Sequence, residues 1–265
     1  MRMIKLIASD LDGTLLEGEH SKISSRTLEL VEKIIDKDIH FVVASGRSFP
    51  NQYKLFEPLR DRISYIAENG ALCIHEGKVF SETPMPEELT KKIITELKKE
   101  QSCDVMVSCS TACFLEKDNY EFIWLVTQDV GTKSRMIDDI SEVQLPILKI
   151  ATRYLGDDSL REVPYLDYLR GLFGKDVQVV TSGNNWIDFM HINANKAIAL
   201  KRLIDHLGIK PEECMAFGDQ NNDMKMLELV GESYVMAKGD VTLRKVAKHV
   251  TDSVEDVLEK LLKNV

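Results

Sequence analysis

Short apolar runs alternate with amphipathic helical segments at both ends of the chain, and this alternation restricts the fold more than any other feature. The first apolar runs cover residues 4–9, 39–44 and 65–67, with helical patterns between them. Strands that are apolar almost throughout, joined by helices, are typical of a parallel sheet covered on both faces. The sequence therefore predicts an α/β fold with a doubly wound, mostly parallel sheet of the Rossmann type.

The same alternation returns in the last third of the chain. A helix is predicted over residues 196–207, and Gly208 and Pro211 behind it are ordinary stop signals. An apolar strand is predicted over 214–217, and three further helices around 223–229, 241–246 and 253–262. Both ends of the chain are thus predicted to contribute to one sheet.

The middle of the chain has a different pattern. A hairpin is predicted over 71–81, and after Pro84 and Pro86 comes an amphipathic helix, 87–99. Longer strand-like runs follow, with one helix before the last of them; the predicted strands are 105–115, 146–154 and 177–181, and the helix is 159–173. We interpret residues 1–84 and 186–265 as one α/β core domain, interrupted by an inserted α+β domain over 85–185.

Charge and hydropathy exclude several classes of partner. Among 265 residues, 34 Lys and Arg face 43 Asp and Glu, which gives a net charge of −9. This balance argues against a nucleic-acid binder, which needs a basic face. No uncharged run approaches the roughly 20 residues that span a bilayer, and the N-terminus leaves no room for a signal peptide. We expect a cytoplasmic protein without a membrane partner.

The five cysteines form no Cys-x-x-Cys pair. Cys109 and Cys113 would share one face of the strand predicted there, and a metal site at this pair is one interpretation. No His lies at ligand spacing nearby, so reduced and mostly buried thiols are the interpretation that we prefer.

Two acidic motifs follow apolar strands. Asp10 and Asp12 belong to the segment Asp-Leu-Asp-Gly-Thr after the first strand, and Asp219 and Asp223 to Gly-Asp-Gln-Asn-Asn-Asp after the strand 214–217. Ligands of parallel α/β sheets gather at the carboxyl ends of the strands. The alternative interpretations are a plain turn for the first motif and a helix N-cap for the second.

If the two strands are neighbours, four carboxylates converge, and they repel one another unless a cation lies among them. Oxygen ligands favour a hard divalent ion, and Mg²⁺ suits a site that also admits a phosphate. The sequence thus predicts Mg²⁺ as the cofactor.

Two weaker motifs suit a phosphate. Ser45, Gly46 and Arg47 end the second predicted strand and offer a hydroxyl, an unhindered backbone and a guanidinium. Lys196 opens a helix, where a cation opposes the helix dipole. The alternatives are an ordinary strand-to-helix turn and a solvated surface lysine.

In this order, the four motifs resemble the haloacid dehalogenase superfamily of phosphatases, and within it the Cof-type subfamily, whose large α/β (C2B-type) cap lies between the second and third motifs. The segment 66–71, Ile-Ala-Glu-Asn-Gly-Ala, also resembles the family. The resemblance implies a Mg²⁺-dependent phosphatase that hydrolyses small-molecule phosphate monoesters, such as sugar phosphates, through an aspartyl-phosphate intermediate.

The resemblance also implies a role for each motif residue. Asp10 would be the nucleophile and Asp12 the general acid and base. Mg²⁺ would be bound by Asp10, the backbone carbonyl of Asp12, and Asp219, with Asp223 in or near the metal shell. The phosphate would be held by Ser45, Gly46, Arg47, Lys196 and Asn222.

Other functions remain compatible with these residues. A phosphomutase or phosphotransferase differs only in the group that receives the phosphoryl. A receiver-type phosphoacceptor signalling protein also combines carboxylates with a Ser or Thr and a Lys, although such domains are about half as long. The oligomeric state cannot be predicted from the sequence, and a monomer is compatible with it.

Overall fold

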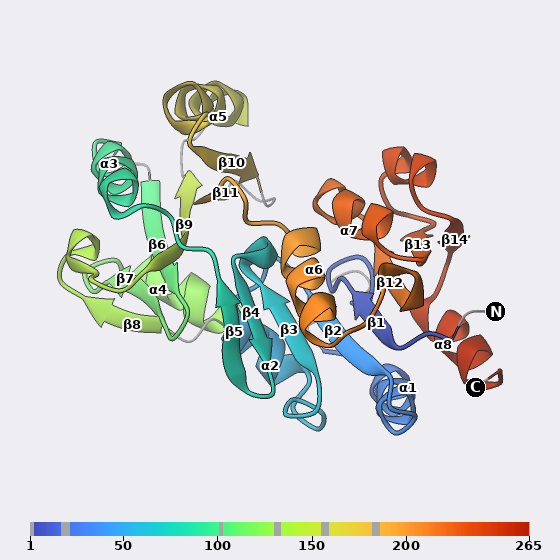
Figure 1. Ribbon diagram of the computed structural model, residues 1–265. Coiled ribbons are helices and arrows are strands. Elements are labelled where there is room, and N and C mark those ends of the chain that lie inside the picture. Colours follow the sequence, from blue (N-terminus) through green and yellow to red (C-terminus); the bar gives the residue numbers. More distant parts are fainter. Residues whose placement is uncertain are drawn as a thin grey trace. The chain divides into compact units, whose positions relative to one another are not determined.

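The computed structural model describes residues 3–16, 22–100, 103–129, 134–154, 159–181 and 186–264. The chain divides into two compact units (Figure 1). The core unit comprises Met1–Ser81 and Asn195–Val265, and the inserted unit comprises Glu82–Ala194. Both ends of the chain therefore build one unit, as the alternation in the sequence predicts.

The core unit contains an eight-stranded sheet (Figure 1). All the strand pairs from β14 to β3 are parallel, and β4 pairs antiparallel with β3. Across the sheet, the order is β14 (His249–Thr251), β13 (Glu232–Met236), β12 (Cys214–Gly218), β1 (Leu6–Ser9), β2 (His40–Ala44), β3 (Ser64–Ala67), β4 (Leu72–His75) and β5 (Lys78–Glu82).

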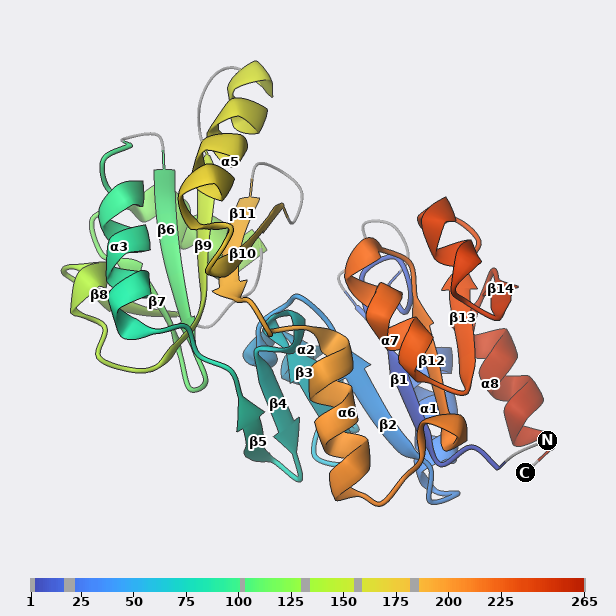
Figure 2. The same ribbon diagram turned by 45° about the horizontal axis from the view of Figure 1, so that its top comes forward.

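Helices cover both faces of this sheet (Figure 2). The helices are α1 (Ser25–Ile35), α2 (Phe49–Leu55), α6 (Lys196–His206), α7 (Met224–Leu229) and α8 (Val254–Leu262), and the short turns are η1 (Glu68–Gly70), η4 (Pro211–Glu213), η5 (Asn221–Asp223) and η6 (Val241–Lys245). Helices α6 and α7 pack together on one face, and α1 packs against α8 on the other. The predicted doubly wound α/β sheet is confirmed.

Successive side chains of a central strand pack against the helices on opposite faces of the sheet. Leu6 and Ala8 of β1 lie in one hydrophobic cluster with Leu200 and Leu203 of α6, whereas Ile7, between them, is fully buried outside this cluster. Successive side chains of a strand point to opposite faces, so an unbroken apolar strand supplies a core to both. This is why the short apolar runs of the sequence are central strands.

Polar side chains cap the starts of two core helices, and α6 ends at the predicted stop signal. The Ser24 side chain accepts a hydrogen bond from the Thr27 N–H at the start of α1, and Asn195 accepts one from the Ile198 N–H at the start of α6. Gly208, with φ of +66°, follows the end of α6 in the left-handed region that favours glycine.

Strand order brings distant motifs to one edge. Strand β1 lies between β12 and β2 and is parallel to both, with Ser9 opposite Phe217 and Val43. The residues after these three strands, beginning at Asp10, Asp219 and Ser45, therefore lie at the same carboxyl edge.

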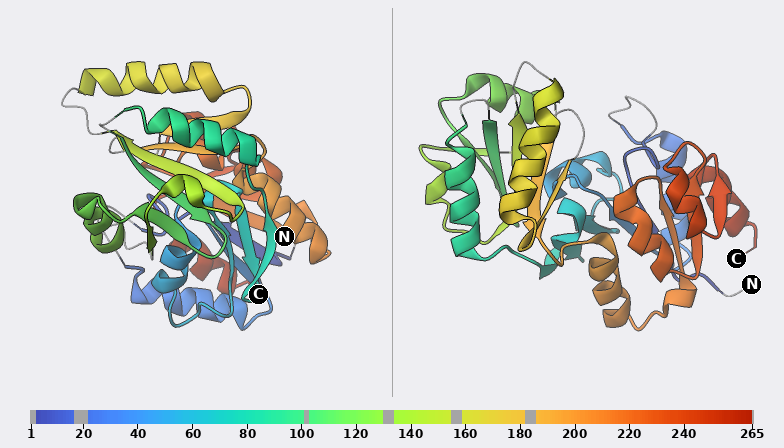
Figure 3. Two further views of the ribbon diagram at one scale, coloured as in Figure 1. Left: turned by 90° about the vertical axis from the view of Figure 1, so that its left-hand side faces the viewer. Right: turned by 90° about the horizontal axis from the view of Figure 1, so that it is seen from above.

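The inserted unit is a six-stranded sheet with helices on both faces (Figure 3). Helices α3 (Glu87–Leu97) and α5 (Ser159–Phe173) lie side by side on one face, and α4 (Tyr120–Trp124) and η2 (Leu125–Asp129) pack on the other. The strand order is β10 (Val177–Thr181), β11 (Trp186–His191), β9 (Ile147–Tyr154), β6 (Cys103–Cys109), β7 (Cys113–Glu116) and β8 (Ser134–Ile137); η3 (Ile140–Glu142) precedes β9.

The prediction of a single strand over residues 105–115 is wrong. The structure has two antiparallel strands, β6 and β7, because the chain turns where the Cys109 N–H donates to the Ala112 carbonyl. Cys109 and Cys113 thus lie on different strands and do not share one face of a strand.

The predicted boundary at residue 186 differs from the structure. Strand β11 begins at Trp186 and belongs to the inserted unit, because it pairs antiparallel with both β9 and β10. Its apolar pattern resembles that of the core strands, so the sequence alone did not separate it from them.

All five cysteines are free, and four are buried. This confirms the preferred interpretation of reduced, mostly buried thiols. Burial raises the pKa of Cys73 to about 12 and that of Cys214 to about 12. No helix in the described ranges combines the length and the apolar character that crossing a lipid bilayer requires.

We predict that iodoacetamide at pH 8 modifies Cys103, which is partly exposed, before Cys73 and Cys214. Thiolate is the reactive form, and burial suppresses both the thiolate and its access to reagent. Peptide mass spectrometry of timed samples measures the order. Labelling of Cys73 as fast in native protein as in urea would contradict the buried position of β4.

Candidate active site

Three carboxylates meet at the carboxyl edge of the core sheet. They belong to Asp10, directly after β1, and to Asp219 and Asp223, after β12. One oxygen from each lies within 4.8 Å of the others, and all three residues are buried. No other group of three or more metal-ligating side chains of this compactness occurs in the described part of the chain. Neighbouring parallel strands thus join residues more than two hundred positions apart.

Lys196 places a cation inside this group. Its side chain is fully buried at the first turn of α6, where Nζ lies 2.6 Å from Asp10 Oδ1 and 2.7 Å from Asp223 Oδ1. The alternative of a solvated surface lysine is excluded. The N-terminus of α6 carries a cation against its dipole because two carboxylates pair with that cation.

The segment after β12 wraps around Asp223. Asp223 Oδ2 accepts hydrogen bonds from the backbone N–H groups of Asp219, at 3.0 Å, and Gln220, at 3.2 Å. Asp223 does occupy the N-cap position of α7, as the alternative interpretation has it, but its side chain makes no cap hydrogen bond to that helix and binds the preceding N–H groups instead. Its second oxygen binds Lys196 at the same time.

Two polar residues that the sequence analysis gave no role contact Asp219. Gln220 Nε2 donates to Asp219 Oδ2 at 3.2 Å, and Thr14 Oγ1 donates to Asp219 Oδ1 at 3.5 Å. Both lie inside the two acidic motifs, so their position next to the aspartates was the signal available in the sequence.

A glycine allows the two acidic segments to approach. Gly13 has φ of +82°, and a Cβ at this position would lie 2.2 Å from Asp219 Oδ2. No other residue fits, because both the left-handed backbone and the contact require the absence of a side chain. The turn predicted after Asp12 exists, and it is also the contact surface for Asp219.

Burial and mutual repulsion raise the proton affinity of the acidic group. Burial raises the pKa of Asp10 well above its ordinary value; Lys196 opposes this, while Asp223 and Asp219 add to it. Burial also raises the pKa of Asp219, and Asp223 acts in the same direction. Burial would lower the pKa of Lys196, but Asp10 and Asp223 outweigh it and raise that pKa, so the lysine is charged.

Asp12 does not join the carboxylate group. Its side chain is 54% exposed and forms a bidentate ion pair with Arg47. Arg47 Nη2 lies 2.5 Å from Asp12 Oδ1, and Arg47 Nε lies 2.9 Å from Asp12 Oδ2. Arg47 Nη1 also donates to Asn51 Oδ1 at 3.1 Å. Arg47, predicted to hold the phosphate, thus pairs with Asp12 outside the group of three carboxylates.

The remaining predicted residues lie around this edge. The buried Ser45 hydroxyl accepts a hydrogen bond from the Arg47 N–H at 3.1 Å, and Gly46 follows it in the same loop. Asn222 is exposed and donates from Nδ2 to Asn69 Oδ1 at 3.0 Å. Asn69 had no assigned role, although an Asn-Gly dipeptide is a strong turn signal.

The donor set fits a hard divalent cation. It consists of carboxyl oxygens alone, and three buried carboxyl groups face a single ammonium, so the site has room for further positive charge. Asp10, Asp219 and Asp223 are the residues that would hold such an ion. The interpretation of Cys109 and Cys113 as a metal site gains no support, because their sulfur atoms contact the Leu145 carbonyl and the Ser108 hydroxyl.

A family model for haloacid dehalogenase-like hydrolases matches residues 7–261. The chain belongs to this family, and it is therefore a hydrolase. The resemblance inferred from the four motifs is confirmed over almost the whole chain.

Related proteins are similar over most of their length. The chain is 26% identical over 266 residues to the 5-amino-6-(5-phospho-D-ribitylamino)uracil phosphatase YbjI of Escherichia coli (strain K12), covering 98% of this chain and 97% of that protein. It is 26% identical to the HMP-PP phosphatase of Escherichia coli O6:H1, covering 94% and 89%.

Solved structures show the same fold. A structure from Eubacterium rectale superposes with a TM-score of 0.85 at 28% identity, covering 97% of this chain and 99% of that one. TM0651 from Thermotoga maritima gives a TM-score of 0.84 at 27% identity, covering 97% of each chain.

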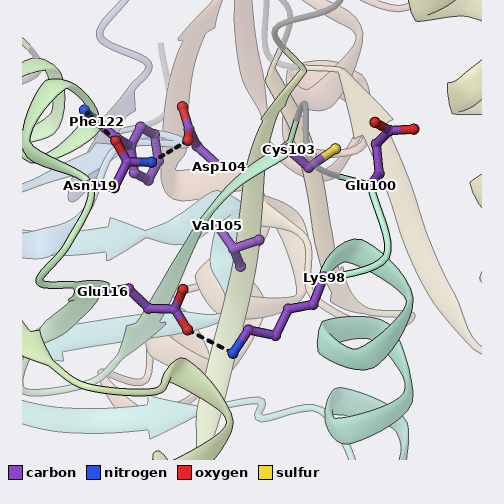
Figure 4. A pocket seen from close by; sticks show the side chains of 8 residues that line it. All are labelled: Lys98, Glu100, Cys103, Asp104, Val105, Glu116, Asn119 and Phe122. Carbon is purple, nitrogen blue, oxygen red and sulfur yellow. Dashed lines mark hydrogen bonds and ion pairs between the residues drawn. The ribbon is translucent and has the colours of Figure 1, made fainter.

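A separate hollow of about 180 Å³ lies in the inserted unit (Figure 4). Four of its polar side chains bind one another in pairs: Lys98 Nζ lies 2.8 Å from Glu116 Oε1, and Asn119 donates to the Asp104 carboxylate. These polar groups are already paired, so we assign no chemistry to this hollow.

We predict that Asp219→Asn raises the melting temperature in EDTA near pH 7 and that this gain disappears towards pH 4. The folded-state pKa of Asp219 is raised, so the wild type loses stability as pH rises from below the ordinary Asp value through the folded value. Asparagine carries no charge and escapes this loss. Thermal melts of both proteins across pH measure the difference.

The matched control is Asp176→Asn, which removes an exposed carboxylate of the inserted unit. Its melting-temperature difference from the wild type should be small across the same pH range. A pH-independent difference for Asp219→Asn would contradict the electrostatic account of the cluster.

Proposed function

We propose that this hydrolase is a Mg²⁺-dependent phosphatase that cleaves small-molecule phosphate monoesters through an aspartyl-phosphate on Asp10. The observation that carries the proposal is the Asp10 carboxylate, held by Lys196 inside a buried acidic group at the carboxyl edge of the sheet. Buried charges are costly unless they are paired, so such a cluster is a functional-site candidate.

The first step transfers the phosphoryl group to the protein. An Asp10 oxygen attacks phosphorus, an O–P bond forms, and the bond from phosphorus to the leaving oxygen breaks. Asp12, protonated from solvent after it leaves its ion pair with Arg47, gives this proton to that oxygen, so an alcohol departs. Mg²⁺, when bound, neutralises charge on the carboxylates and the phosphoryl oxygens.

The second step returns the enzyme to its starting state. Water attacks phosphorus, Asp12 takes the proton of the water, and the bond between phosphorus and Asp10 breaks to release inorganic phosphate. Lys196, as an ammonium, supplies donors to phosphoryl oxygens in both steps. The Ser45 hydroxyl accepts a bond from Arg47 and keeps its own hydrogen for the same purpose.

Asp12 is suited to a role that needs movement. It is exposed and shares its oxygens with Arg47, whereas Asp10 is fixed by the buried Lys196. A nucleophile must be held in line, while an acid must reach first the leaving group and then water. The difference in burial therefore supports different roles for the two aspartates.

The names of the relatives support the substrate class. One is named for a phosphoribityl-aminouracil and another for HMP-PP, and both are named phosphatases. We infer a small organic phosphate as the substrate, in a cytoplasmic enzyme that needs no nucleic acid or membrane. The inserted unit of about a hundred residues argues against a receiver domain.

We predict that a panel of small phosphate monoesters with Mg²⁺ contains at least one substrate and that Asp10→Asn abolishes its turnover. The amide cannot act as the attacking carboxylate, and the replacement keeps size and shape. Release of inorganic phosphate is the measurement, with EDTA as the metal-free control. Ordinary turnover by Asp10→Asn would exclude Asp10 as the nucleophile. Transfer to an added alcohol instead of water would identify a phosphotransferase.

We predict that Asp12→Ala slows hydrolysis of an alkyl phosphate by about 10²- to 10⁴-fold and that of an aryl phosphate far less, because a phenolate leaves without a proton. Steady-state kinetics on both esters give the two ratios. Equal losses on the two esters would indicate that Asp12 acts by position or charge rather than as an acid.

A further inference from the structure

The turn η1, which links β3 to β4, has an unusual backbone. All three of its residues have positive φ: +50° for Glu68, +53° for Asn69 and +99° for Gly70. L-residues avoid this region, apart from Asn and Gly, and such backbone persists only where surrounding contacts enforce it. The segment 66–71 resembles the family, yet the proposed mechanism uses none of its residues.

The contacts that enforce this backbone come from the loop Ser45–Arg47, which follows β2. The Glu68 N–H donates to the Arg47 carbonyl at 3.1 Å, and the Asn69 N–H donates to the Ser45 carbonyl at 3.1 Å. A Cβ on Gly46 would lie 3.0 Å from Asn69 Oδ1, so this loop lies directly against the Asn69 side chain.

The same turn also contacts the segment after β12 and the start of α6. Asn69 Oδ1 accepts a hydrogen bond from Asn222 Nδ2, which follows β12. A Cβ on Gly70 would lie 2.2 Å from the Asn195 carbonyl, next to Lys196. Three segments distant in sequence therefore meet at one three-residue turn.

We propose that Asn69 is a positioning residue, which fixes the Ser45–Arg47 loop relative to Asn222 and so sets the width of the phosphate site. Asparagine suits this place, because it tolerates the left-handed region and its amide oxygen reaches across to Asn222. The proposal rests on the proposed function, since it assigns a phosphate to this edge. Asn69 acts through Ser45 and Asn222 and is not itself assigned to the chemistry.

The test is Asn69→Gly, which keeps the left-handed backbone and removes the amide. The matched control is Glu76→Gly in the exposed β4–β5 hairpin, where Glu76 has a similar φ of +51°. We expect Asn69→Gly to lower kcat/KM by about 10- to 100-fold, because misplacing a binding group by about 1 Å has effects of this size. The control should keep kcat/KM, and both variants should melt close to the wild type.

A double-mutant cycle separates positioning from a merely structural role. Asn222→Ala and Asn69→Gly should be non-additive in kcat/KM, since each removes the same contact. Additive losses, or an unchanged kcat/KM in Asn69→Gly, would overturn the proposal.

A second measurement does not depend on turnover. With Mg²⁺, inorganic phosphate should raise the melting temperature of the wild type and raise that of Asn69→Gly less. If the wild type binds phosphate but hydrolyses no ester, the proposed function fails, and this comparison still decides the role of Asn69. If phosphate raises the melting temperatures of the wild type and of Asn69→Gly equally, the proposed role of Asn69 is wrong, whatever the ester panel shows.

Discussion

The rest of the site depends on the buried ammonium of Lys196. Its two short contacts, with Asp10 and Asp223, hold together two segments that begin more than two hundred residues apart. Removing one partner of a buried ion pair typically costs about 3–5 kcal/mol, because the other charge is left without compensation. The lysine thus makes an otherwise self-repelling set of carboxylates compatible with a folded protein, and it leaves enough negative charge for a divalent cation.

Strand order explains why these particular segments meet. Because β1 lies between β2 and β12 and is parallel to both, the loops carrying Asp10, Ser45 and Asp219 all leave the sheet at one edge. Glycines without room for a Cβ, Gly13 and Gly70, then allow the loops to approach within contact distance. The strand order brings the loops to the same edge of the sheet, and the glycine turns allow them to come into contact.

Prediction from the sequence succeeded where local pattern and tertiary environment agree. The hairpin around Glu76 and the helix α5 lie where the pattern placed them, since turn residues and helical spacing are local signals. The two strands β6 and β7 were merged because their shared apolar run hides a turn with no Gly or Pro. Strand β11 was assigned to the wrong unit because which sheet a strand joins depends on its partners, not on its composition.

The amino-acid sequence was enough to predict the α/β class, the parallel sheet and the residues of the acidic motifs, because apolar periodicity and the polar residues at strand ends are local patterns. The sequence did not reveal that Lys196 is buried, that Asp12 pairs with Arg47, or that Asn69 contacts a second loop; the folded chain shows all three. These are contacts between side chains far apart along the chain. Their geometry follows from packing and charge pairing in three dimensions, to which no local pattern refers.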